Sequence, residues 1–149
     1  MADFSWRARV RATGRGDATA LVRSHRFEVG APVQFDEQYD RVTALEYVLA
    51  ALGADLVKSF QAAADRRRLA LDQIEAVVTG RLDNPLVHLG VVGEAGHPGL
   101  ESVAVRLFVA TEADEARVRA VWDEALARSP LARTFGAAAR LDLTLRVVP

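Results

Sequence analysis

The side chain that the sequence singles out for chemistry is Asp55. It follows Leu45, Val48 and Leu52 by ten, seven and three residues, so a helix would place all four on one face. An unpaired carboxylate is costly inside a protein, and an inward Asp55 therefore needs a cation or several hydrogen-bond donors. It could be a general base or the anchor of a cationic or hydroxylated ligand. It could instead be a paired structural acid, or one turned to solvent at the mouth of a pocket.

Ser129 and the three histidines are the other groups that could carry polar chemistry. A hydroxyl at Ser129 could bond a ligand, but a Ser-Pro pair is typical of a turn and favours a role at a helix end. No motif connects Ser129 with His25, His88 or His97, so the sequence does not support a catalytic triad with Asp55. His88 and His97 also lack the spacing of metal ligands, and we expect neither a metal nor a cofactor.

Two further charged residues could serve a pocket beside Asp55. Arg15 lies in a glycine-rich turn, where it is either the pocket's cation, paired with Asp55 or Glu46, or an exposed turn residue. Glu46 stands three residues after Thr43, as in a capping box, and this capping role alone accounts for its presence.

The composition excludes several classes of function. The chain has no cysteine, which excludes disulfides, thiolate metal sites and thiol nucleophiles. A net charge of −1 gives no general attraction to nucleic acid or to an anionic membrane. Lys58 is the single lysine among 19 basic residues, which indicates a compositional bias toward arginine. We therefore interpret the run Arg66–Arg68 as a solvated helix end rather than a phosphate site.

The start of the chain has no apolar run that could serve as a signal peptide, and no stretch approaches the roughly 18 apolar residues of a membrane span. We expect a cytoplasmic protein with no membrane partner.

The elements that must position these residues follow the order β-β-α-β-β-β-α-β. A chain of 149 residues that is 50% hydrophobic can form one domain over 1–149, and this order belongs to the α+β class. The predicted strands span 5–11, 20–29, 74–82, 87–92, 102–111 and 140–148, and the predicted helices span 43–69 and 114–128.

This order and three local sequences resemble the OsmC/Ohr family of hydroperoxide-reducing proteins. Thr43–Asp55 resembles the central-helix signature, in which a glutamate and small residues lead to the peroxidatic cysteine, and Asp55 stands at that position. Ser129–Thr134 resembles the segment of the resolving cysteine, with Ser129 in its place. The turn that contains Arg15 resembles the hairpin whose arginine orients the peroxide in the Ohr branch.

The resemblance implies antiparallel sheets wrapped around a long central helix, in an intertwined homodimer with pockets at its interface. In members with both cysteines, one thiolate attacks the peroxide and the other closes a disulfide. A carboxylate has no comparable oxidation state, so this chain cannot use that chemistry. We expect a member that binds a small molecule or has a regulatory or structural role. The alternative is a hydrolase or isomerase of a small organic substrate, with Asp55 as its acid or base, assisted by Arg15 or Glu46.

Overall fold

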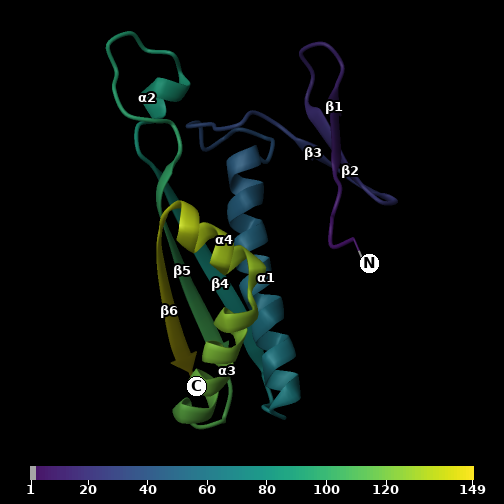
Figure 1. The fold of residues 1–149 in the computed structure, drawn as a ribbon, viewed down its shortest axis with the longest axis vertical. Coiled ribbons are helices and arrows are strands. Elements are labelled where there is room, and N and C mark those ends of the chain that lie inside the picture. The colour runs from purple at the N-terminus through teal and green to yellow at the C-terminus, as the bar shows by residue number, and fades with distance from the viewer. Residues whose placement is uncertain (1–2) are drawn as a thin grey trace. The chain divides into compact units, whose positions relative to one another are not determined.

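The computed structural model describes residues 3–149, and Figure 1 shows its elements. The described chain forms two compact units, one up to Val48 and the other from Leu49. The organisation as a single domain over 1–149 stays a prediction.

The N-terminal unit contains an antiparallel sheet in the order β1-β2-β3. The predicted turn between the first two strands is confirmed, because the Gly16 N–H donates to the carbonyl of Thr13 at 3.2 Å and Gly14 has a φ of 60°. The strands are β1 (Arg9–Ala12), β2 (Ala18–Val22) and β3 (His25–Val29).

The prediction of one strand over 20–29 is wrong, since this segment forms the hairpin of β2 and β3. The chain reverses at Arg23 and Ser24, and Arg23 adopts the left-handed conformation with a φ of 55°. No glycine, asparagine or aspartate marks this turn, so no local signal predicts it.

The long helix α1 (Ala44–Arg66) confirms the helix predicted over 43–69, with an earlier end. It begins after Thr43, which caps it. At its other end Arg68 is left-handed with a φ of 52°, and the Leu69 N–H donates to the carbonyl of Ala64 at 2.9 Å. This hydrogen bond satisfies one of the carbonyl groups that have no partner within the last turn of a helix.

The second unit contains a mixed sheet in the order β4-β5-β6. β5 (Leu100–Ala110) pairs antiparallel with β4 (Gln73–Leu82) and parallel with β6 (Arg140–Val148). The α+β class is confirmed, but the expectation of purely antiparallel sheets is wrong. β6 runs parallel because two helices, α3 (Glu115–Arg128) and α4 (Pro130–Ala138), carry the chain back before it enters the sheet.

Two elements depart from the predicted order. The strand predicted over 87–92 is wrong, because the short helix α2 (Pro85–His88) ends within this segment and a turn follows it. Pro85 fits the first helical position, and the Asn84 side chain accepts a hydrogen bond from the Leu86 N–H at 3.1 Å. The helix α4 was not predicted at all.

The core of the second unit lies between one face of the sheet and the helices. Gly53 lets α1 approach β4 closely, since a Cβ there would lie 3.0 Å from a methyl group of Val78. This packing fixes the parts of α1 and α3 that carry the candidate site. The largest fully buried side chains come from α1 (Leu52, Leu56, Phe60), β5 (Val103, Val105, Leu107, Val109) and α3 (Val118, Val121).

Among residues 3–149, no helix is both long enough and apolar enough to cross a membrane.

Candidate functional site

Asp55 and Ser129 meet in the second unit, although 74 residues separate them in the sequence. Asp55 lies in α1, beside the fully buried Leu56, and its own side chain is half-buried. Ser129 ends α3 and begins α4, and it is only 3% exposed. The stripe of α1 and the junction of the two later helices therefore bring the carboxylate and the hydroxyl to one place.

A short chain of hydrogen bonds joins the two residues. The Ser129 hydroxyl donates to Asp55 Oδ2 at 2.5 Å, and the Leu131 N–H donates to the same oxygen at 3.1 Å. Ser129 Oγ in turn accepts from the Ala132 N–H at 3.0 Å, as the cap of α4. We call this arrangement the Asp55–Ser129 link.

The link makes Asp55 a paired acid at the N-terminus of α4. Two donors converge on Asp55 Oδ2, and a negative charge at the start of a helix is stabilised by the helix dipole. Asp55 therefore needs no cation to be stable at this depth. The hydrogen bonds of the link connect α1 with the start of α4.

The histidines of the second unit, His88 and His97, are not part of the Asp55–Ser129 link. His88 is in α2, and His97 is in the connection that leads to β5. His97 is engaged with its own loop, since its Nδ1 accepts from the Gly99 N–H at 3.1 Å and its backbone N–H donates to Asp83 at 3.1 Å. Within residues 49–149, Ser129 thus has no histidine as a partner.

Glu46 belongs to the N-terminal unit and forms the predicted capping box with Thr43. One Glu46 oxygen accepts from both the backbone N–H and the hydroxyl of Thr43 at 2.8 Å, and the Glu46 N–H donates to the Thr43 hydroxyl at 3.2 Å. The Thr43 N–H first, and then its hydroxyl, lower the pKa of Glu46. The capping role of Glu46 is confirmed.

Arg15 is exposed in the turn between β1 and β2. Its pairing with Asp55, which lies in the other unit, stays a prediction.

The residue that sequence reasoning missed is Leu131, whose N–H contributes the second donor to Asp55. The signal for it was present, because a serine followed by proline is a favourable start for a helix, with serine as cap and proline at the first position. From the sequence alone we interpret Ser129 as a residue that caps or ends the helix predicted over 114–128, so the start of α4 is not predicted.

Solved structures similar to this chain come from several bacteria. An OsmC-like protein from Mycoplasma pneumoniae is 16% identical over 99% of this chain and 98% of its own, with a TM-score of 0.78. The organic hydroperoxide resistance protein OsmC from Legionella pneumophila is 13% identical over 100% of both chains, with a TM-score of 0.69. The organic hydroperoxide resistance protein OhrB of Bacillus subtilis is 16% identical over 97% and 98%, with a TM-score of 0.62. At these identities the likeness shows the fold.

No curated protein matches the sequence. The family model described as "OsmC-like protein" matches residues 36–144, which include α1, β4, β5, the first half of β6 and both partners of the link. The absence of cysteine fits a loss of the family's thiol chemistry. This chain belongs to the OsmC-like protein family.

Proposed function

We propose that this chain is a non-redox OsmC-like protein that binds a small molecule or regulates a partner, without peroxide turnover. The observation that carries the proposal is the Asp55–Ser129 link. The two residues whose sequence context resembles the peroxidatic and resolving cysteines lie within hydrogen-bond distance of each other.

The chemistry of the two side chains supports this proposal. Reduction of a hydroperoxide takes two electrons from the protein, and a thiolate supplies them by becoming a sulfenate. The carboxylate of Asp55 and the hydroxyl of Ser129 have no such oxidation step. The hydrogen bonds of the link can hold α1 and α4 together, as a disulfide would, but they cannot cycle.

The geometry gives less support to the alternative, an acid/base enzyme centred on Asp55. A general base must present a free oxygen to its substrate. Asp55 Oδ2 already accepts from the Ser129 hydroxyl and the Leu131 N–H, which leaves Oδ1 alone for chemistry.

We also propose that the chain forms a homodimer, as members of this family usually do. The sheet of the N-terminal unit supports this proposal, because it buries little of its own apolar surface. Its one buried hydrophobic residue is Ala20, whereas the cross-strand neighbours of Ala20 are exposed, Val10 to 61% and Phe27 to 41%. A three-stranded sheet needs an apolar face packed against something to be stable, and a second chain can provide that packing.

The oligomeric state is measured by analytical ultracentrifugation of the full chain. We expect twice the mass of one chain at micromolar concentration. A monomer at all concentrations would refute the homodimer. The cytoplasmic location and the absence of nucleic-acid and membrane partners stay predictions from the sequence.

The main experiment is a hydroperoxide assay on the purified protein, with tert-butyl hydroperoxide or hydrogen peroxide and dithiothreitol as reductant. We expect consumption no faster than in a blank without protein. Turnover at roughly 1 per second or faster would contradict the proposal, because that is an ordinary enzymatic rate.

A further inference from the structure

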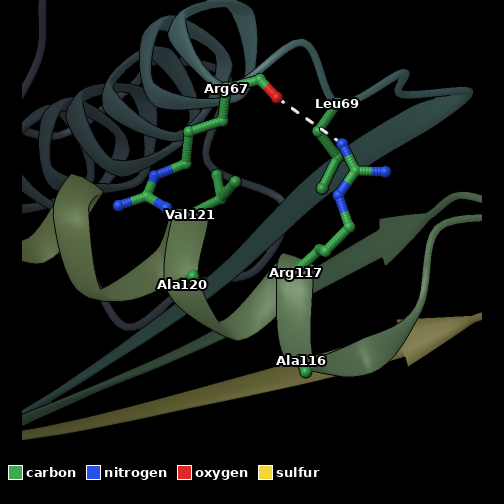
Figure 2. Close-up of a pocket in the computed structure, with 6 residues that line it drawn as sticks. All are labelled: Arg67, Leu69, Ala116, Arg117, Ala120 and Val121. Atoms are coloured by element: carbon green, nitrogen blue, oxygen red, sulfur yellow. Dashed lines mark hydrogen bonds between the residues drawn. The ribbon is translucent and has the colours of Figure 1, made fainter.

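A second polar site lies in the same unit as the Asp55–Ser129 link but shares no residue with it. It is a pocket of about 400 Å³ between the end of α1 and the N-terminal half of α3. We call it the arginine pocket, and Figure 2 shows its lining. It is lined by Arg67, Leu69, Ala116, Arg117, Ala120 and Val121.

The end of α1 holds one side of this pocket in a fixed shape. The Arg67 N–H donates to the carbonyl of Ala63 at 3.1 Å, and the Leu69 N–H reaches back to Ala64 at 2.9 Å. Arg68 makes the reversal possible through its left-handed backbone. Leu69 is only 4% exposed, so its buried side chain anchors the turn.

Both guanidinium groups of the pocket are held by other parts of the protein. Arg67 donates from Nε to Glu124 at 2.7 Å. Arg117 donates from Nη2 to the carbonyls of Arg67 and Arg68 at 3.5 and 3.4 Å. Figure 2 shows the contact of Arg117 with the Arg67 carbonyl as a dashed line. The two cations are therefore positioned before any ligand arrives, which lowers the entropy cost of binding.

Each guanidinium retains donors that the protein does not use. Within residues 3–149, the terminal nitrogens of Arg67 and the Nη1 and Nε of Arg117 have no hydrogen-bond acceptor. The one carboxylate bonded to Arg67 is also shared, because Glu124 accepts from Arg66 at 2.6 Å and lies 3.7 Å from Arg128. Three arginines thus share a single glutamate.

The floor between the two cations is apolar. The methyl groups of Ala116, which is exposed, and of Ala120, which is half-buried, form this surface, and the buried Leu69 and Val121 lie beneath it. A ligand that uses the whole pocket must present a negative group to the arginines and an apolar group to this floor.

We propose that the arginine pocket binds a small organic anion, a carboxylate that carries a short apolar chain. The planar fork of a guanidinium matches the two oxygens of a carboxylate, and both arginines offer unused donors for it. A bare inorganic anion would meet the charge but leave the apolar floor uncovered. This site is independent of the proposed function of the Asp55–Ser129 link.

The probe for this proposal is pentanoate, titrated at pH 7 and low salt into the full-length isotope-labelled protein and followed by two-dimensional NMR. We expect saturable shifts of the Leu69, Ala120 and Val121 amides, with a dissociation constant on the order of 1 mM. Pentanamide has the same shape without the charge and is expected to bind at least about tenfold more weakly, since hydrogen bonds to a charged group are the stronger ones.

Variants locate the binding in the pocket. Arg117→Gln and Arg67→Gln are each expected to weaken pentanoate about tenfold. The matched control is Arg119→Gln, which removes an arginine of the same helix that pairs with Glu115 outside the pocket. It is expected to leave the affinity within about twofold, because exposed ion pairs contribute little. Ala120→Glu keeps a good helix former and should abolish binding by placing a carboxylate in the pocket.

Four results would overturn the proposal: no saturable shifts at these amides, equal binding of pentanamide, equal binding of inorganic phosphate, or an equal effect of Arg119→Gln. If Arg117→Gln loosens the end of α1, Arg67→Gln and Ala120→Glu still decide the outcome.

Discussion

Removal of the Asp55 carboxylate tests how much the Asp55–Ser129 link contributes to the fold. In the Asp55→Ala variant, the Ser129 hydroxyl and the Leu131 N–H both lose their acceptor. Ser129 is 3% exposed, so water can replace that acceptor only in part. The Ala132 N–H keeps its bond to Ser129, and α4 therefore retains one capping interaction.

The expected loss follows from these contacts. A hydrogen bond to a charged group contributes about 1.5–3 kcal/mol, which gives about 3–6 kcal/mol for two such bonds on one oxygen. Asp55 is half-buried, and solvent that enters the variant recovers part of this energy. Alanine is also a better helix former than aspartate by about 0.5 kcal/mol. We therefore expect a net decrease of about 2–3 kcal/mol in the free energy of unfolding.

Urea denaturation followed by far-ultraviolet circular dichroism measures this change. The matched control is Asp65→Ala, which makes the same substitution in α1 at an exposed position and is expected to cost no stability. Hydrogen exchange adds local information, since the Leu131 amide should exchange faster in Asp55→Ala while buried amides of β5 change only with global stability.

A loss below about 0.5 kcal/mol, with an unchanged dependence on urea, would refute the reasoning, because that is the range of neutral surface substitutions. An unchanged exchange rate at Leu131 would show that its bond to Asp55 is not formed in solution.

Two further predictions concern the capping box and the core. Glu46→Gln should reduce stability at neutral pH. The pKa of Glu46 is lower in the folded state, so its contribution is present above the ordinary glutamate pKa of about 4.3 and disappears as the pH falls through the lowered value. Urea denaturation at pH 7 and pH 3 checks this, and an equal difference from wild type at both values would contradict it. Leu107→Ala should cost about 2–5 kcal/mol because Leu107 is fully buried in β5, whereas Val77→Ala on the exposed face of β4 should cost about 1 kcal/mol or less. Similar losses for these two variants would show that the core is not where the structure places it.

Elements with a strong local signal could be predicted from the sequence. The helix α1 and its capping box at Thr43 depend on neighbouring residues, and both were found. Of the predicted apolar stripe, Leu52 is buried, whereas Val48 is 43% exposed. The edge strand β6 was predicted correctly from its alternation of apolar and polar residues, because that pattern depends only on the residues of the strand and not on its neighbours in the sheet.

Features that depend on contacts between distant parts of the chain could not be predicted from local sequence patterns. Alternation does not reveal the neighbour of a strand, so the parallel pairing of β6 with β5 was missed. The turn at Arg23 lies inside one continuous alternating segment. The partners of Asp55 became visible only with the fold, because Leu131 is 76 residues away. The family resemblance supplied the positions 55 and 129, but not the bonds between them.

The central claim is that positions 55 and 129 face each other as the two thiols of the family would. The Asp55→Cys/Ser129→Cys double variant tests it most directly, by mass spectrometry after mild oxidation of the purified, folded protein. We expect an intramolecular disulfide, seen as the loss of two hydrogen atoms and reversed by dithiothreitol, because the wild-type side chains of the two residues are in direct hydrogen-bond contact. A folded double variant that keeps two free thiols, or forms only links between chains, would contradict the account.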